Sequence, residues 1–304
     1  MDGTALHFVH ACDSHVRSGL EHFRADLASL TAFVERVKAL RESGVAIDFV
    51  VHTGDLVDEV DDPDAASDAT RAALSILDGL PVRWFLLNGN HDRRAILVGD
   101  GREGGDVCPS GPGDASPSGP ADVRPSGLGD VPAMSRAGVA VREVGGVQLI
   151  FVDANPESGG RADLYGELSP EAVATLAWHM DDHPGQSVVF LHYPPLAQEA
   201  SWPGACVGGG ALHALLVPRA ESLYGVFVGH NHRAVHHLRD GVLYTTAPAL
   251  TRQFLLWPGQ ETFAADDEPV SGLHYVTLET NGATRVQHHA FVDLGKLAGR
   301  GSAS

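Results

Sequence analysis

The chain has few cysteines, few aromatic residues and no long hydrophobic run. Its 304 residues include three cysteines, Cys12, Cys108 and Cys206, without the C-x-x-C spacing of thiolate metal sites. This set excludes a disulfide framework and fits a reducing compartment. Aromatic residues make up 7% and hydrophobic residues 43% of the chain, which suffices for a packed core and is not typical of a disordered protein.

No segment is apolar over the roughly 20 residues that a membrane-spanning helix needs. The opening residues Met1-Asp2-Gly3 lack the basic and apolar regions of a secretory signal. We therefore expect a soluble, cytoplasmic protein that does not act at a membrane.

Positive charge is also scarce, because lysine occurs only at Lys38 and Lys296 and the formal net charge is −18. Proteins that bind nucleic-acid polymers usually display basic patches that neutralise phosphates, so such a polymer is not an expected partner. A small anionic substrate stays compatible with this charge if bound metal ions supply a local positive field.

Five apolar runs end in polar clusters, and these clusters carry most of the functional information. The runs cover residues 6–12, 47–52, 82–87, 187–191 and 226–228. They are followed by Asp13-Ser14-His15, Gly54-Asp55, Gly89-Asn90-His91-Asp92, His192 and Gly229-His230-Asn231-His232. Open α/β sheets present ligands at the carboxyl ends of their strands. Carboxylate, amide and imidazole groups are donors that divalent transition metals bind.

A turn or a helix cap would explain any one of these clusters taken alone. Glycine before Asp55, Asn90 and His230 suits a sharp turn as well as close approach to an ion. Strongly polar side chains from five strands on one rim are costly unless a metal or a counter-charge compensates them. The ordered set therefore favours a metal site over five unrelated turns.

In these residues the chain resembles the calcineurin-like metallophosphoesterases, whose pattern is D-x-H, G-D, G-N-H-[DE], H and G-H-x-H. The resemblance spans roughly residues 6–250. It is strongest to the bacterial class III 3′,5′-cyclic-nucleotide phosphodiesterases, because the third cluster continues as Asp92-Arg93-Arg94 and His192 precedes Tyr193-Pro194-Pro195.

The resemblance implies two divalent ions, Mn, Fe or Zn, with one carboxylate bridging them. The first ion would be held by Asp13, His15, Asp55 and His232, and the second by Asp55, Asn90, His192 and His230. Two such ions activate a shared water, so that a bridging hydroxide attacks phosphorus. His91, together with Asn90, would contact the phosphate, and His91 would protonate the leaving oxygen; alternatively, His91 only orients Asn90 or a water.

Other polar residues have two interpretations each. Arg93 and Arg94 either clamp a phosphate or form an ordinary surface pair, and we include Arg94 among the substrate-binding candidates. Asp92 is expected to form local hydrogen bonds or to cap the next segment.

The histidines within apolar runs are expected to lie in the core or on a sheet face; they are His7, His10 and His52. The pairs His236-His237 and His288-His289 are interpreted as solvated, because strand neighbours point to opposite faces and cannot share one metal.

The organisation of the chain predicts one catalytic domain over residues 1–294 and a flexible tail at 295–304. Helices are expected from Leu20, with an apolar stripe to Val37 and an end at Gly44, through 65–79 and from Ser169-Pro170. Residues 99–134 are rich in Gly, Pro and Ser and predict a flexible surface insertion, either inert or a lid over the site. A hairpin at 139–153 and strands near 234–238, 242–246, 273–279 and 284–291 follow. With the resemblance, this order predicts an α/β fold: a four-layer α/β/β/α sandwich of two mixed sheets.

The predicted function is metal-dependent hydrolysis of a small phosphodiester such as a 3′,5′-cyclic nucleotide. Hydrolysis of phosphomonoesters or phosphoproteins on the same metals is the alternative within enzymes. The alternative outside enzymes is a binding scaffold that has lost catalysis, which the complete set of motif residues disfavours.

Overall fold

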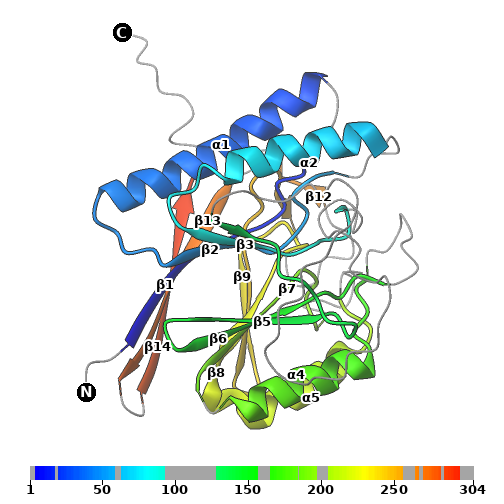
Figure 1. Cartoon of the computed structure of the whole chain (residues 1–304), viewed down its shortest axis with the longest axis vertical. Coiled ribbons are helices and arrows are strands. Elements are labelled where there is room, and N and C mark those ends of the chain that lie inside the picture. The colour runs from blue at the N-terminus through cyan, green and yellow to red at the C-terminus, as the bar shows by residue number, and fades with distance from the viewer. Residues whose placement is uncertain are drawn as a thin grey trace.

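Two mixed β-sheets packed face to face form the centre of the molecule. The computed structural model describes residues 4–17, 20–58, 63–92, 128–156, 165–183, 185–196, 205–255, 264–266, 270–281 and 284–294. Helices cover the outer face of each sheet, which gives the four-layer α/β/β/α sandwich that the sequence predicts (Figure 1).

The first sheet has six strands in the order β14-β13-β1-β2-β3-β4. Their bounds are Thr4–Ala11 for β1, Phe49–His52 for β2, Arg83–Leu86 for β3, Gly129–Asp130 for β4, Gly272–Asn281 for β13 and Thr284–Asp293 for β14. Strands β1 to β4 are parallel, whereas β13 and β14 form an antiparallel hairpin beside β1. The carboxyl ends of the parallel strands therefore lie along one edge.

The second sheet has six strands in the order β5-β6-β7-β8-β10-β9. Their bounds are Val139–Val144 for β5, Val147–Val152 for β6, Ser187–Leu191 for β7, Leu223–Val228 for β8, Val235–Arg239 for β9 and Val242–Thr246 for β10. The four central strands are parallel and the outer strands β5 and β9 are antiparallel to their neighbours. A separate two-stranded sheet pairs β11 (Phe254–Leu255) with β12 (Ala264–Ala265).

The helices pack by apolar stripes that the sequence displays. Helices α1 (Leu20–Glu42) and α2 (Pro63–Leu77) cover the first sheet, and α4 (Pro170–Asp182), α5 (Gly209–Leu216) and the 3₁₀ helix η1 (Val217–Ser222) lie against the second (Figure 1). Helix α4 starts as predicted, with Pro170 in the first turn and the Ser169 hydroxyl accepting the Ala172 N–H at 3.0 Å. Helix α5 was not predicted.

Aromatic side chains fill the layer between the two sheets. Six phenylalanines meet there, with the rings of Phe8 and Phe49 stacked at 4.9 Å and those of Phe8 and Phe227 edge to face at 5.1 Å. The six are Phe8, Phe49, Phe85, Phe151, Phe190 and Phe227. Each is fully buried, and burying such a ring contributes up to about 3 kcal/mol. Six of the 11 phenylalanines of the chain thus join the two sheets.

One predicted boundary is wrong. We expected residues 99–134 to form a surface insertion, but Gly129–Asp130 form β4 beside β3, and the Trp84 N–H donates to the Leu128 carbonyl at 3.1 Å. The sheet therefore resumes at Leu128. The remainder of the predicted insertion, 99–127, and the predicted tail at 295–304 lie outside the described residues.

Among the helices of the described residues, none has the length and apolar character needed to cross a membrane.

Candidate metal centre

The polar clusters of the sequence lie at the carboxyl ends of parallel strands from both sheets. Each cluster directly follows a strand, and the packing of the two sheets brings the clusters into contact. Asp13 and His15 follow β1, Asp55 follows β2, Asn90 and His91 follow β3, His192 follows β7, and His230 and His232 follow β8.

Asp13, His15, Asp55 and His232 form a first group of potential ligands. All four are buried, and one donor atom of each lies within 4.8 Å of the others. His15 Nε2 is 2.8 Å from His232 Nε2 and 3.4 Å from Asp55 Oδ2. Asp13 Oδ1 lies 3.4 Å from His232 Nε2, yet it is buried without a hydrogen-bond partner in the described part of the chain. A cation between these donors would satisfy that oxygen.

A second group shares Asp55 with the first and adds His192 and His230. His192 Nε2 lies 3.4 Å from Asp55 Oδ2. Asn90 joins this group through its side-chain oxygen, which is 3.0 Å from both His192 Nε2 and His230 Nδ1. Oxygen and imidazole donors around two adjoining spaces, with one carboxylate common to both, fit a pair of divalent transition-metal ions.

Backbone groups fix the orientation of several of these side chains. His192 Nδ1 is 2.8 Å from the Thr53 carbonyl and His232 Nδ1 is 2.9 Å from the Arg252 carbonyl. A carbonyl only accepts, so in both rings Nδ1 carries the proton and Nε2 is left to bind a metal. The backbone N–H of His230 donates to Asp13 Oδ2 at 3.0 Å, which orients that carboxylate.

The backbone of the site adopts conformations that are uncommon for residues with a side chain. In the described residues, six non-glycine residues have positive φ, and five belong to this site. They are Asp13 (φ 55°), His15 (42°), Asp55 (54°), His230 (70°) and His232 (49°). Such residues cost about 1 kcal/mol or more each and cluster at functional sites.

Glycine is required where the loops touch. A Cβ on Gly54 would lie 2.6 Å from the Gly89 nitrogen, and one on Gly229 would lie 2.9 Å from Cys12 Cβ. The glycines noted in the sequence therefore permit close approach of loops from different strands.

The carboxylates and histidine rings of the site shift one another's pKa values. Burial raises the pKa of Asp13 and Asp55, but the nearby histidine rings outweigh it and hold both pKa values well below the usual range. Burial lowers the pKa of His15 and His192. The nearby carboxylates of Asp13, Asp58 and Asp55 raise the pKa of His15 to about 10, and the charge of Asp55 raises that of His192 to about 9. Bound cations would displace these protons and take over the compensation of the carboxylates.

Comparisons with known proteins agree with this geometry. Residues 6–234 match the model of the calcineurin-like phosphoesterase family. The chain belongs to this family.

The phosphoesterase is 28% identical over 251 residues to the glycerophosphodiester phosphodiesterase GpdQ of Enterobacter lignolyticus, a match that covers 81% of this chain and 77% of the relative. In fold it is similar to a dimetal phosphatase from Danio rerio, with a TM-score of 0.60 and 13% identity over 94% of this chain and 99% of the other. It is also similar to GAP50, the anchor in the inner membrane complex of Plasmodium, with a TM-score of 0.52 and 14% identity over 96% and 86%.

His91 of the phosphoesterase lies beside both groups without belonging to either. The backbone N–H of His91 donates to Asp55 Oδ1 at 2.8 Å, and the ring Nδ1 lies 2.8 Å from Asp58 Oδ1. Its side chain is 27% exposed, so it can reach a bound substrate.

Sequence reasoning missed two residues of this region, Asp58, which contacts His91, and Arg252, which contacts Asp58. Asp58 contacts His15, His91 and Arg252 at 3.5, 2.8 and 3.8 Å. Arg252 lines a cavity of about 270 Å³ together with His15 and Arg17. The spacing Asp55-x-x-Asp58 was visible in the sequence, whereas nothing in the sequence connects Arg252 with the site.

The other predicted residues have varied outcomes. Arg93 and Arg94 lie outside the described residues. Asp92 forms a local hydrogen bond as predicted, accepting the backbone N–H of Gly89 at 2.8 Å, and it also accepts the backbone N–H of Val57 from the loop after β2 at 3.1 Å. His10 and His52 are buried core residues and His7 lies on a sheet face, as predicted.

The interpretation of His289 as solvated is wrong, because its ring is half-buried and stacks on Phe227 at 5.7 Å. The preceding residue on the same strand, His288, is exposed as predicted.

Proposed function

We propose that this phosphoesterase is a dinuclear-metal phosphodiesterase that hydrolyses small phosphodiesters. One observation carries the proposal: two groups of buried donors share Asp55 and adjoin His91, and His15 of the first group also lines a small cavity. In this assignment Asp13, His15, Asp55 and His232 hold one ion, and Asp55, Asn90, His192 and His230 hold the other. Mn, Fe and Zn all suit these donors. Two ions at these positions would supply a water-derived nucleophile near neutral pH and neutralise charge on the phosphoryl oxygens.

The chain's own residues contribute proton transfer and substrate orientation. Asp58 fixes His91 through Nδ1 at 2.8 Å, so Nε2 is directed to the substrate and donates a proton to the leaving oxygen. Asn90 and His91 would contact the phosphate. Arg252, with a 42% exposed side chain in the cavity wall, would bind a second polar group of the substrate; Arg94 would act similarly from the next segment of the chain.

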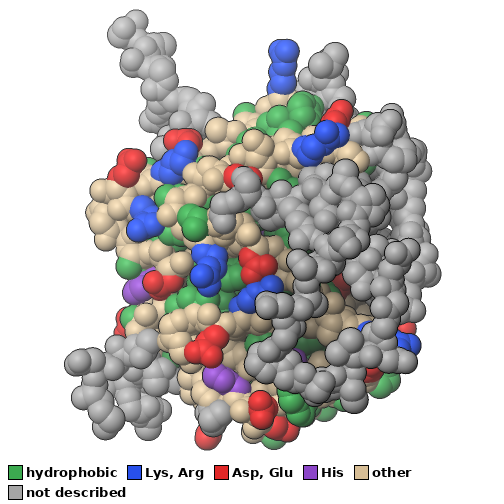
Figure 2. Space-filling model, in the orientation of Figure 1, with side chains coloured by type: hydrophobic (Ala, Val, Ile, Leu, Met, Phe, Trp, Pro, Cys, Tyr) green, Lys and Arg blue, Asp and Glu red, His purple; other side chains and the backbone are tan. Residues whose placement is uncertain are grey.

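A diester is favoured over a monoester by the relative GpdQ, which is named a glycerophosphodiester phosphodiesterase. A cavity of about 270 Å³, lined in part by His15 and Arg252, lies beside the first group of donors. Glycerophosphodiesters and 3′,5′-cyclic nucleotides are the two kinds of small diester proposed as substrates. A nucleic-acid polymer is not a proposed substrate, because the chain carries a net charge of −18 and acidic and basic side chains are interspersed on the face shown in Figure 2.

The scaffold alternative has some support from the fold, since GAP50, a protein described as an anchor, shares it. Fold similarity at 14% identity does not decide activity. Retention of all the donor residues and of His91 favours catalysis. We also place the protein in the cytoplasm, supported by the buried free thiols of Cys12 and Cys206.

The experiment is a substrate panel on metal-loaded protein. Glycerophosphocholine, 3′,5′-cyclic AMP, bis-p-nitrophenyl phosphate and p-nitrophenyl phosphate are compared at equal concentration. We expect turnover of the diesters to exceed that of the monoester. We expect Asn90→Ala and His91→Ala to lower kcat by about 100-fold or more, whereas His179→Ala on α4 leaves it unchanged. Turnover of the monoester alone would replace the diesterase assignment with a phosphatase, and full activity in Asn90→Ala would refute the ligand assignment.

A further inference from the structure

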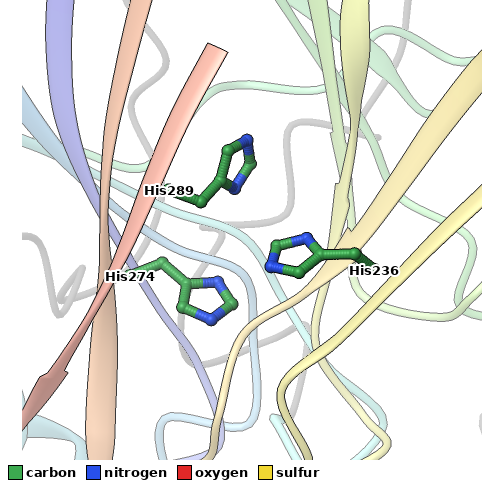
Figure 3. Close-up of side chains that lie close together, drawn as sticks. All are labelled: His236, His274 and His289. Atoms are coloured by element: carbon green, nitrogen blue, oxygen red, sulfur yellow. The ribbon is translucent and has the colours of Figure 1, made fainter.

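A second cluster of histidines lies between the sheets, outside the candidate metal centre. His236 comes from β9, the edge strand of the second sheet, and His274 and His289 come from β13 and β14 at the edge of the first. One ring nitrogen of each lies within 4.8 Å of the others. Figure 3 shows the three rings pointing toward one another across the gap between the strands.

The strand register explains why two of these histidines share a face. His274 pairs with Phe291 and His289 pairs with Val276 across β13 and β14. The two histidines are therefore diagonal neighbours whose side chains project from the same side of the sheet. Their side faces the second sheet, since His289 stacks on Phe227 of β8.

Hydrogen bonds to neighbouring side chains fix which nitrogens are directed into the cluster. His236 Nδ1 lies 3.2 Å from Thr245 Oγ1, and His289 Nε2 lies 3.1 Å from Gln287 Oε1. These contacts leave Nε2 of His236 and Nδ1 of His289 for another partner. A ligating imidazole typically has its second nitrogen held in this way.

Two of the nitrogens in the cluster are buried and unsatisfied. In the part of the chain that the structure describes, Nδ1 of His274 and Nδ1 of His289 have no hydrogen-bond partner. His274 is 2% exposed. Leaving a buried polar atom without a partner costs about 1–3 kcal/mol, and a metal ion would remove this cost.

The rings are in the protonation state that binds metals. Burial, followed by repulsion from the other histidines, lowers the pKa of His274 to about 3 and that of His289 to about 4. Burial also lowers the pKa of His236. All three are therefore neutral near pH 7, as ligation requires.

We propose that His236, His274 and His289 form a mononuclear transition-metal site, with Zn²⁺ as its ion, that joins the edges of the two sheets. A set of three imidazoles without a carboxylate suits zinc, copper or nickel and disfavours magnesium or calcium. Zinc–nitrogen bonds of about 2.0–2.1 Å place tetrahedral ligands about 3.4 Å apart. The three nitrogens lie within 4.8 Å of one another, so the side chains would have to close by up to about 1.4 Å around a bound ion. No ligand is shared with the Asp55 centre.

The test is a count of bound zinc in the full-length protein, made by equilibrium dialysis at low micromolar free Zn²⁺ and elemental analysis. Wild type is expected to hold about three equivalents, of which two belong to the Asp55 centre. His236→Ala and His289→Ala are each expected to hold about two. The matched controls His237→Ala and His288→Ala change the adjacent histidines, which point to the opposite faces, and are expected to keep about three.

A second variant separates this site from the proposed phosphodiesterase centre. Asp55→Asn is expected to lose zinc from that centre but to keep the equivalent that His236→Ala removes. His236→Ala is expected to hydrolyse phosphodiesters as wild type does and to retain its circular dichroism spectrum. The proposal is overturned if His236→Ala binds as much zinc as wild type, or if His288→Ala loses an equivalent as His236→Ala does.

Discussion

At the scale of single residues, Asp58 links the candidate metal centre to the cavity beside it. Its carboxylate lies within 4 Å of two histidine rings and one guanidinium. Burial raises the pKa of Asp58, but hydrogen bonds from His15 and His91 lower it well below the usual range. Asp58 is therefore ionised near neutral pH and, in the proposed function, would influence the substrate through the groups that it orients.

We predict that Asp58→Asn lowers kcat by about 10- to 100-fold with a smaller change in KM, because His91 loses its fixed orientation. The measurement is steady-state kinetics with bis-p-nitrophenyl phosphate. In a His91→Ala background the same substitution should have little further effect. Asp130→Asn, which breaks the ion pair with Arg142 on a distant edge strand, is the matched control. Equal losses from Asp58→Asn with and without His91 would show that Asp58 acts independently of that ring.

The sequence predicted the residues that follow strand ends and missed those that reach the site from elsewhere. Asp13, Asp55, Asn90, His192 and His230 could be found because the end of an apolar run locates the end of a strand. Arg252 lies in an irregular segment after β10, and its position depends on how that segment crosses the site. No periodicity marks such a crossing.

At the scale of the structural elements, the loops after β1 and β2 act as one unit. The Asp13 N–H donates to the Gly54 carbonyl and the His15 N–H donates to the Asp55 carbonyl, both at 3.0 Å. These bonds extend the parallel pairing of the strands into the site. The residues of the two loops that have positive φ, Asp13, His15 and Asp55, are thereby fixed before any ligand binds.

We predict that Gly54→Ala reduces stability far more than Gly44→Ala, although both glycines have positive φ, 105° and 89°. Nothing lies within 4 Å of a Cβ on Gly44, so only the conformational cost of about 1 kcal/mol applies there. A Cβ on Gly54 would collide with Gly89, which adds to that cost and displaces Asp55.

Urea unfolding and bound-metal analysis measure these two effects. We expect Gly54→Ala to lose at least about 2 kcal/mol of unfolding free energy and to bind less metal. Gly44→Ala should bind the full amount. Similar stability and metal content in the two variants would contradict the close contact between the loops.

At the scale of the whole molecule, the folded chain carries a net charge of −18. Like charges on the surface repel one another and destabilise the compact state, and salt screens this repulsion. The fold also joins its two sheets mainly through apolar rings, whose packing does not depend on screening.

We predict that raising KCl from about 0.1 to 1 M increases the free energy of unfolding, because the screening length falls from about 10 to 3 Å. The measurement is a series of urea titrations at fixed metal content. Choline chloride should act like KCl if screening is the cause. An unchanged or lower urea midpoint at high salt would show that surface repulsion does not limit stability.

The architecture of the whole molecule was largely predictable, because most strands and the helices α1, α2 and α4 each have their own apolar pattern. The exceptions have physical reasons. Strand β4 has only two residues, Gly129–Asp130, and pairs through its backbone without an apolar signal. The cluster of His236, His274 and His289 depends on which strands face one another across the sandwich, and a pattern within one strand carries no information on that packing.

The contact of Asp13 with His230 joins residues 217 positions apart in the chain. During its synthesis the chain therefore lacks part of the donor set for a metal pair until β8 and the loop after it have been made. A full set of donors for the proposed metal pair would therefore form only after more than 220 residues have been synthesised, so a product truncated before β8 would lack His230 and His232.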